Sequence, residues 1–345
     1  MAGTINKRRE ALLYEKLEDK TVHCQLCAHR CFISSGKRGI CSVRENRDGT
    51  LYTLVYGKAI AANVDPIEKK PLFHFLPGSK SYSIATAGCN FRCGFCQNWE
   101  ISQISKGPRG QIVGEKLPPE KIVKEALETG CKSIAYTYTE PTIFFEYAYD
   151  TAKLAHKKGL ANIFVTNGYQ TPETVAKMKG VIDAANVDLK SFSDDFYQKV
   201  CGARLKPVLK SIKKLYQNSI FLEITTLIIP DQNDSEKELW QIAKFIAKVS
   251  PNIPWHISRF HPDYQIIDNP TTPLETLRRA YDLGKKAGLR YVYLGNVLTD
   301  TGENTYCPKC QKLVIERLGY NIRVLAVTNK GKCGYCEESL NIINE

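Results

Sequence analysis

The sequence predicts an α/β protein built on a full or partial (β/α) barrel, with a small cysteine-rich extension at each end. Two observations predict this class. Between residues 79 and 300, apolar strand-like segments alternate with amphipathic helix-like segments. Eleven of the thirteen cysteines fall into three groups, which lie before, at the start of and after this region. Repeated strand–helix units form a parallel sheet covered by helices.

The alternating region contains six or seven strand–helix units. Its helical segments carry apolar residues at helical spacing, and Ser235 with Glu238 forms a capping box that opens one of them. The expected strands are 81–88, 132–138, 161–168, 184–190, 220–229, 254–260 and 290–295. The expected helices are 119–130, 142–158, 172–180, 206–217, the one that begins at the capping box, and 274–288.

Three domains follow from this organisation. Residues 1–78 form an N-terminal metal-binding region with four cysteines, 79–300 the barrel, and 301–345 a C-terminal module of the zinc-ribbon kind. No apolar run is long enough to span a membrane, and no apolar signal segment follows the charged first ten residues. We therefore expect a cytoplasmic protein without a membrane partner.

The formal net charge of +12 favours a polyanionic partner such as RNA. The alternative is that the scattered lysines only keep the protein in solution. Cysteines in a cytosolic chain point to metal sites, because cytosolic thiols stay reduced. Disulfides of the kind found in hyperthermophiles are the competing interpretation.

The central cysteine group has the spacing C-x3-C-x2-C. Cys89, Cys93 and Cys96 supply three thiolates to three irons of a [4Fe–4S] cluster, which leaves the fourth iron open to another ligand. The alternative is a zinc site completed by a distant residue such as His74 or Cys131.

The other two groups each contain four cysteines. Two C-x2-C pairs separated by 22 residues predict a zinc ribbon at the C-terminus, with a structural role or a role in recognition. The N-terminal spacing favours zinc, with His23 or His29 as substitute ligands, and a second [4Fe–4S] cluster is the alternative. The C-terminal group is Cys307, Cys310, Cys333 and Cys336, and the N-terminal group is Cys24, Cys27, Cys31 and Cys41.

In a (β/α) barrel the working residues lie at the C-terminal ends of the strands. Polar residues follow the expected strands here, and they are candidates for one site. Cys201 follows the loop after the fourth strand, where it either packs structurally or faces the substrate as a catalytic thiol or hydrogen donor. The strand-end candidates are Cys89, Glu140, Asn167, Lys190, Arg259 and Asn296.

At these residues the chain resembles the radical S-adenosylmethionine (SAM) superfamily. Within it the chain is similar to enzymes related to pyruvate formate-lyase activase, and most similar to the AmmeMemoRadiSam system radical SAM enzymes. The resemblance covers almost the whole chain. The segments that carry it are CQLCAHRCFISSGKRGICSVR (24–44), KKPLFHFLPGS (69–79), GCNFRCGFCQNWEISQ (88–103), AYTYTEPTIFFE (135–146), NVDLKSF (186–192) and VCGARLKPVL (200–209).

The resemblance implies a SAM molecule chelated to the open iron of the cluster. Phe95 would lie against adenine, and Glu140 would end the family motif that receives the SAM amino group. Tyr138 and Thr139 stand where that motif has two glycines, which leaves the local shape open. The remaining contacts to the SAM carboxylate and ribose would come from Asp188, Lys190, Asn167, Glu223 and Arg259.

The implied reaction is reductive cleavage of SAM to a 5′-deoxyadenosyl radical. The expected substrate is a macromolecule, through RNA modification or C-alkylation. The alternatives are activation of a glycyl-radical enzyme, a small-molecule substrate, and a non-catalytic zinc-ribbon protein that binds RNA. The implied partners are an electron donor such as ferredoxin or flavodoxin, and proteins of the AMMECR and Memo types.

Overall fold

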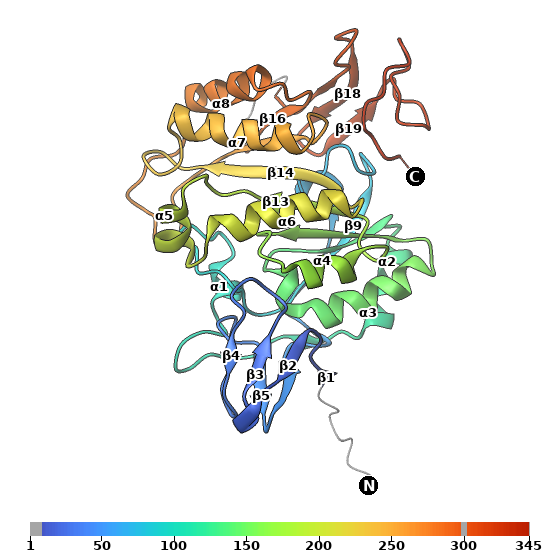
Figure 1. Ribbon diagram of the computed structural model, residues 1–345. Coiled ribbons are helices and arrows are strands. Elements are labelled where there is room, and N and C mark those ends of the chain that lie inside the picture. The colour runs from blue at the N-terminus through green and yellow to red at the C-terminus, as the bar shows by residue number, and fades with distance from the viewer. Residues whose placement is uncertain (1–8, 298–301, 345) are drawn as a thin grey trace.

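The structure, a computed structural model, describes residues 9–297 and 302–344, and its centre is one eight-stranded sheet (Figure 1). Seven consecutive strands pair in parallel, and β8 pairs antiparallel with β9 at one edge. Strand β16 forms the other edge, so the barrel is partial. In sheet order the strands are β16 (Val292–Gly295), β15 (Trp255–Arg259), β14 (Phe221–Ile228), β13 (Ala184–Asp188), β12 (Ala161–Thr166), β11 (Ser133–Tyr136), β9 (Lys80–Ala85) and β8 (Ala61–Pro66).

The seven parallel strands are the seven strands that the sequence predicts. Strand β8 was not expected, and it joins the sheet although it precedes residue 79. The expected boundary between residues 300 and 301 lies outside the described residues. Six helices lie where the sequence predicts them, and their bounds are α2 (Pro119–Glu128), α3 (Phe145–His156), α4 (Pro172–Met178), α6 (Leu205–Gln217), α7 (Glu236–Val249) and α8 (Leu274–Lys286). The short helices α1 (Trp99–Ser102) and α5 (Asp194–Phe196) were not expected.

The helix expected over 142–158 begins differently from the prediction. A 3-10 turn over Pro141–Phe144 precedes α3, and the Glu140 side chain caps it by accepting from Thr142 N. Proline suits the first position of such a turn because its missing N–H has no partner there. Ser235 caps α7 by accepting from Glu238 N, as the capping box predicts.

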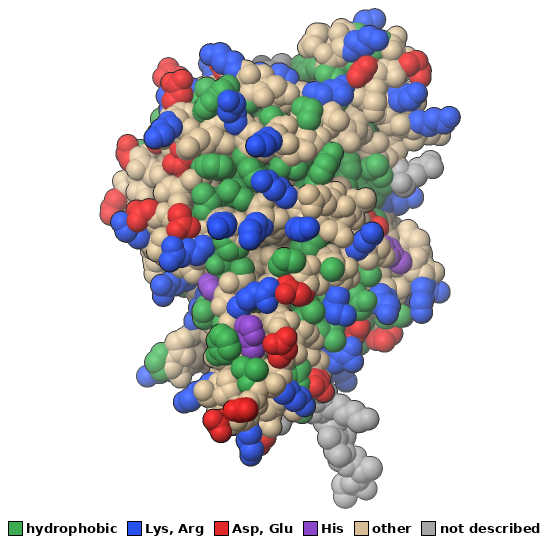
Figure 2. All heavy atoms as spheres, viewed as in Figure 1, with side chains coloured by type: hydrophobic (Ala, Val, Ile, Leu, Met, Phe, Trp, Pro, Cys, Tyr) green, Lys and Arg blue, Asp and Glu red, His purple; other side chains and the backbone are tan. Residues whose placement is uncertain are grey.

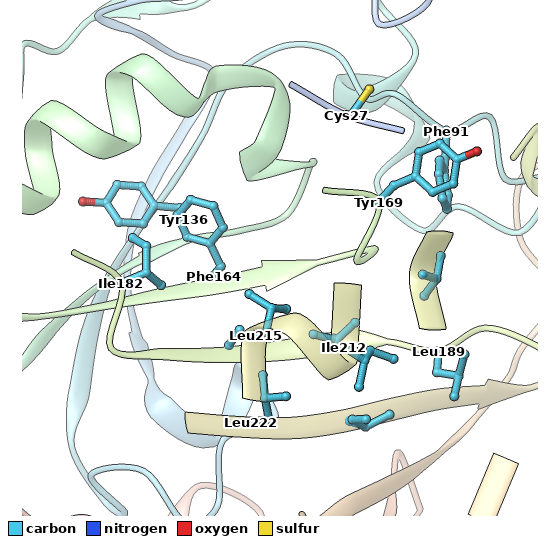
Figure 3. Close-up of a cluster of buried hydrophobic side chains, with 14 of the residues drawn as sticks. Cys27, Phe91, Tyr136, Phe164, Tyr169, Ile182, Leu189, Ile212, Leu215 and Leu222 are labelled. Atoms are coloured by element: carbon cyan, nitrogen blue, oxygen red, sulfur yellow. The ribbon is translucent and has the colours of Figure 1, made fainter. Parts of the chain in front are cut away.

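The core lies between the sheet and the helices that cover it. Figure 3 shows Ile212 and Leu215 of α6 facing Phe164 and Leu222 of the strands. Each of these four side chains is buried, and burial of an apolar side chain stabilises a fold by roughly 1.5–3 kcal/mol. The apolar stripe of α6 therefore holds it over β12–β14 and orients its lysines outward.

The N-terminal extension consists of short antiparallel strands (Figure 1). A buried ion pair of 2.5 Å between Arg44 and Glu146 of α3 ties it to the barrel. One three-stranded sheet contains β1 (Arg9–Glu10), β6 (Thr50–Thr53) and β5 (Arg44–Arg47), and a second contains β2 (Tyr14–Lys16), β3 (Val22–Cys24) and β4 (Phe32–Ile33). Strand β7 (Lys58–Ala59) pairs with β10 (Glu115–Lys116).

The C-terminal extension is a three-stranded antiparallel sheet at the opposite end of the molecule from the N-terminal strands (Figure 1). Its strands are β17 (Thr305–Tyr306), β18 (Leu313–Leu318) and β19 (Asn321–Val324). His74 anchors the last segment to the barrel, since its Nδ1 lies 3.1 Å from Leu340 O and its Nε2 lies 2.6 Å from the Tyr293 hydroxyl. Within the described residues, no helix has the length and apolar character needed to cross a bilayer.

Candidate active site

The central cysteines lie on the loop between β9 and α1. Gly88 opens this loop with φ +103°, and a Cβ atom on it would lie 2.7 Å from Val43 Cγ1, so a larger residue does not fit. The loop is fixed from the other side, because Arg92 N donates to Cys201 O at 2.9 Å and Gly94 N donates to Val200 O at 3.1 Å. The cysteine loop is therefore clamped between the N-terminal extension and the segment that follows β13.

All three cysteines of this loop line a cavity of about 950 Å³ at the C-terminal ends of the strands. This is the end at which a (β/α) barrel carries its active site. The cavity is large enough for a cofactor and part of a substrate. Among the predicted site residues, it is lined by Cys89, Cys93, Cys96, Phe95, Tyr138, Glu140, Asn167, Asp188, Lys190 and Asn296.

Glu140 is fixed by four hydrogen bonds. Its Oε1 accepts from Thr142 N at 2.9 Å, from Thr142 Oγ1 at 2.5 Å and from Thr166 Oγ1 at 2.7 Å. Its Oε2 accepts from Asn167 N at 2.8 Å. Burial raises the pKa of Glu140, although these hydrogen bonds oppose the rise. Glu140 thus joins the end of β12 to the turn after β11, where both border the cavity.

Asn167 connects this pair of strand ends to the cysteine loop. Its Nδ2 donates to Asn90 Oδ1 at 2.7 Å and lies 4.0 Å from Cys89 Sγ. Both asparagines are buried, so the contact is shielded from water. The result is a continuous polar chain from Glu140 to the first cysteine.

Tyr138 adopts φ +61°, in the left-handed region that glycine enters most readily. The glycine-like backbone shape is therefore present although the residue is tyrosine. The surroundings hold it there, because the hydroxyl donates to Asp65 and Lys70 Nζ lies 4.6 Å from the ring centroid. Burial lowers the pKa of Lys70 to about 8, against the opposing effect of Asp65.

Lys190 supplies a buried cation to the cavity. Its Nζ lies 2.9 Å from Asp188 Oδ2 and 5.5 Å from the centroid of the Phe95 ring. Burial acts to lower the pKa of Lys190, but the charges of Asp188 and Cys93 outweigh it and raise the pKa well above its ordinary value. Lys190 therefore remains an ammonium group that suits a carboxylate ligand.

Two predicted residues do not reach the cavity. The Glu223 carboxylate accepts from the backbone N–H groups of Phe73 and His74 at 3.0 and 2.7 Å, and lies 2.6 Å from His256 Nε2. Arg259 Nε donates to Thr272 O at 2.9 Å. Both side chains hold neighbouring segments in place. The sequence predicted that they contact SAM, but neither side chain lines the cavity.

Cys201 is fully buried and does not line the cavity. Its thiol contacts Cys93, and this hydrogen bond, together with burial, raises the pKa of Cys93. Gly202 after it has φ +69°, and a Cβ there would lie 2.7 Å from Arg92 Nε. The structure thus places Cys201 behind the cysteine loop and outside the cavity lining.

The cavity also contains residues that the sequence did not single out. Lys70 and Phe73 come from the segment after β8. They lie in the 69–79 segment that carries part of the family resemblance, which could have marked them as site residues. Leu318 ends β18, and Gly319 and Tyr320 form the turn to β19; all three line the cavity from the C-terminal extension. No local pattern marked that turn, because its place depends on how the extension packs on the barrel.

The two groups of four cysteines differ in geometry. In the C-terminal group all four sulfurs lie within 4.8 Å of one another, with Cys307 Sγ 3.6 Å from Cys336 Sγ and Cys310 Sγ 3.8 Å from Cys333 Sγ. A hydrogen bond from Lys312 N lowers the pKa of Cys310 to about 7, which favours the thiolate that binds a metal. The four N-terminal cysteines line one pocket, but among the described residues only the C-terminal set meets this spacing.

The family comparison matches the segment that builds this site. The family model described as the radical SAM superfamily matches residues 83–246, from β9 through the cysteine loop into α7. This chain belongs to the radical SAM superfamily. The uncharacterized protein MJ0808 of Methanocaldococcus jannaschii is 45% identical over 337 residues, which is 97% of this chain and 99% of that protein.

Two further comparisons, one of sequence and one of structure, match this radical SAM enzyme at lower identity. The pyruvate formate-lyase 1-activating enzyme of Escherichia coli is 20% identical over 161 residues, which is 46% of this chain and 65% of that protein. A solved radical SAM methyltransferase from Sphaerobacter thermophilus shares the fold, with a TM-score of 0.51 and 13% identity, over 63% of this chain and 66% of that chain.

The residues present fit the cofactors that the superfamily uses, a [4Fe–4S] cluster and SAM. Three thiols of one loop face the cavity, and within the described residues no fourth cysteine lines it. The sulfurs of this loop do not form the compact set that one zinc ion needs. Lys190 and Phe95 lie in the same cavity and offer a cation and an aromatic face to SAM.

Proposed function

We propose that this radical SAM enzyme modifies a macromolecule, and that the macromolecule is RNA, through C-alkylation or a related modification. The observation that carries this proposal is the cavity wall formed by the C-terminal extension. Leu318 and Tyr320 line the cavity while 71% and 62% of their surfaces remain exposed. An exposed aromatic ring at the mouth of a site is suited to stacking on a nucleic acid base.

The charge of the protein supports the same proposal. Lys69, whose side chain is 46% exposed, lines the cavity, and the chain carries a net charge of +12. Figure 2 shows a short row of basic side chains across one face, over α6, whose exposed lysines are Lys206, Lys210, Lys213 and Lys214. Phosphate groups bind to such surfaces with an affinity that falls as salt rises.

The roles of the site residues follow from their places in the cavity. When bound, the cluster and SAM supply reductive cleavage of the sulfonium C5′–S bond of SAM, which generates a hydrogen-abstracting radical. Lys190 would hold the SAM carboxylate, and Phe95 would lie against adenine. Asn167 would contact SAM from the strand end that Glu140 fixes. The protein's contribution is positioning and the exclusion of water.

The reaction also needs an electron donor, and we propose a ferredoxin or flavodoxin. The similarity to the AmmeMemoRadiSam subgroup supports AMMECR-type and Memo-type proteins as further partners. We propose zinc for the C-terminal cysteines, because a Zn–S distance of about 2.3 Å in a tetrahedral site separates the sulfurs by about 3.8 Å. Metal analysis of a Cys310→Ser variant tests this assignment, which predicts the loss of zinc without the loss of iron.

The test of the substrate class uses reconstituted enzyme, SAM, dithionite and total RNA from a strain that lacks the enzyme. The proposal predicts a mass increase in RNA nucleosides together with 5′-deoxyadenosine. Tyr320→Ala should lower this modification at least tenfold, whereas Tyr335→Ala should not, because Tyr335 is 51% exposed in the same extension but does not line the cavity.

A second candidate is activation of a partner enzyme through a glycyl radical. The similarity to the Escherichia coli pyruvate formate-lyase 1-activating enzyme favours it. The same assay separates the two candidates when the RNA is replaced by the protein fraction of the deletion strain. A glycyl-radical EPR signal in that fraction, with unmodified RNA, would overturn the RNA proposal.

A further inference from the structure

The four cysteines of the N-terminal extension surround a small pocket that shares no lining residue with the active-site cavity. All four thiols lie on its wall. The rest of the wall is largely apolar, and Arg44 and His29 are its basic residues. The apolar residues of the wall are Leu26, Ile33, Gly39, Ile40 and Ile143. Such a lining excludes water, and it suits a metal cluster whose bridging sulfides are part of the cluster.

The distances between the sulfurs decide what kind of group fits. One zinc ion draws its four sulfurs to about 3.8 Å from one another, because each bond is about 2.3 Å long in a tetrahedral site. The C-terminal cysteines have this spacing, but no three of the N-terminal cysteines lie within 4.8 Å of one another, as judged over residues 9–297 and 302–344. The three central cysteines share the wider spacing. In a cubane each thiolate binds its own iron, so the sulfurs lie farther apart.

Arg44 provides an independent observation, a buried hydrogen-bond donor beside the thiols. Its guanidinium is buried, with 1% of its surface exposed, and its Nη1 lies 3.6 Å from Cys24 Sγ. Glu146 and the carbonyl oxygen of Leu12 accept from Arg44 Nη2, whereas Arg44 Nε has no hydrogen-bond partner among the residues that the structure describes. A buried donor without a partner is costly, and a ligand with acceptor sulfurs would satisfy it. Hydrogen bonds from protein groups to the sulfurs of a cluster are one means by which its potential is set.

We propose that the N-terminal pocket holds a second, fully ligated [4Fe–4S] cluster on Cys24, Cys27, Cys31 and Cys41, and that this cluster carries electrons to the central one. The N-terminal group contacts the central cysteine loop directly, because His29 Nε2 lies 2.8 Å from the carbonyl oxygen of Asn90, which follows Cys89. A second contact comes from just beyond α1, where Ser105 Oγ donates to Cys41 O at 3.4 Å. The pocket is therefore adjacent to the loop that binds the central cluster.

The proposed step transfers one electron and makes or breaks no bond. A low-potential one-electron donor of the ferredoxin class reduces the N-terminal cluster. That cluster is oxidised again when it passes the electron to the central cluster, which uses it to cleave SAM. With four protein ligands, the N-terminal cluster has no open iron, so SAM does not bind to it.

The experiment uses the full chain with the three central cysteines replaced, Cys89→Ala, Cys93→Ala and Cys96→Ala together, after anaerobic reconstitution with iron and sulfide. The proposal predicts that about four irons and four sulfides remain per chain. Dithionite should produce a [4Fe–4S] EPR signal that SAM does not change. Zinc in place of this iron, or no metal beyond that of the C-terminal site, would overturn the proposal.

A complementary variant keeps the central site and alters the N-terminal one. Cys31→Ser should lose about half of the iron of the reconstituted wild type, whereas Cys131→Ser, at a buried thiol outside the three groups, should lose none. For each protein the rate of 5′-deoxyadenosine formation is measured with reduced ferredoxin and with dithionite. The ratio of the ferredoxin rate to the dithionite rate should be at least tenfold lower in Cys31→Ser than in wild type. An unchanged ratio would overturn the electron-transfer role. These measurements need no RNA, so their outcome is independent of the substrate proposal.

Discussion

The carboxylate of Glu140 accepts a hydrogen bond of 2.8 Å from the backbone N–H of Asn167, and this bond joins the ends of β11 and β12 at the cavity. The Asn167 side chain continues the connection to Asn90 on the cysteine loop at 2.7 Å. Glu140, which follows β11, thus positions Asn167, which follows β12. Asn167 in turn positions the loop that carries the central cysteines.

Replacing Glu140 by Gln should weaken SAM binding and the fold together. A glutamine has one acceptor oxygen, so donors among Thr142, Thr166 and Asn167 lose a partner, at about 1–3 kcal/mol for an unsatisfied buried group. We expect a roughly tenfold weaker affinity for SAM, about 1.4 kcal/mol, by equilibrium dialysis. Glu128→Gln is the control, since Glu128 is exposed on α2, where it pairs with Lys124. Equal affinities for SAM in both variants would show that Glu140 does not position the site.

Tyr138→Gly should be more stable than Tyr138→Ala. Both variants lose the contacts with Asp65 and Lys70, so the comparison isolates the backbone. At φ +61° alanine pays a steric cost that glycine does not, and we expect a difference of roughly 1 kcal/mol in the free energy of unfolding. Denaturant titration of the two variants measures it. A more stable alanine variant would mean that this turn relaxes to a negative φ.

Cys201→Ala should retain SAM cleavage, because the Cys201 side chain is buried behind Cys93 and outside the cavity. The loss of one small buried group lowers the free energy of unfolding by about 1 kcal/mol, which leaves most of the protein folded. We therefore expect a rate of 5′-deoxyadenosine formation within about threefold of wild type once iron content is matched. Cys131→Ala serves as the matched control for a buried thiol. Normal iron content without turnover would restore the interpretation of Cys201 as a catalytic thiol.

His74 should make the fold sensitive to mild acid. Burial lowers the pKa of His74 to about 4, whereas an unfolded histidine titrates near 6.5. Between these values the unfolded chain binds the extra proton, so stability falls as the pH drops through this window. The loss reaches about 3 kcal/mol at pH 4, with about 2 kcal/mol of it by pH 5.

The pH prediction is tested by denaturant unfolding at pH 7 and pH 5 in wild type and in His74→Gln. The variant lacks the titrating group, so its stability should fall less over this range. Parallel decreases in the two proteins would assign the acid sensitivity to other groups.

The sequence predicted the parallel strands and the covering helices because each has a strong periodicity and clear ends. The rule that barrel sites lie at strand ends also predicted five residues of the cavity, Cys89, Glu140, Asn167, Lys190 and Asn296. The cysteine spacing added Cys93 and Cys96, and only the family resemblance implied Phe95, Tyr138 and Asp188. The sequence did not predict β8, whose AANVDP segment has no apolar alternation and pairs only because β9 offers a free edge.

The remaining differences have the same origin in tertiary packing. Glu223 and Arg259 occupy strand positions that suggest a site, but their side chains bind the 73–74 backbone and Thr272 instead. Tyr320 reaches the cavity through a module more than 60 residues beyond β15, which no local pattern encodes. The spacing of the N-terminal thiols likewise depends on the fold, because residues 31 and 41 meet only across a loop.

The most direct test of the account is SAM cleavage by the central cysteine loop. Anaerobically reconstituted wild-type protein with dithionite should convert SAM to 5′-deoxyadenosine, and Cys93→Ala should not do so above background. Cys131→Ala should behave as wild type, since its thiol lies outside the cavity. Equal production of 5′-deoxyadenosine by Cys93→Ala and wild type would contradict the account.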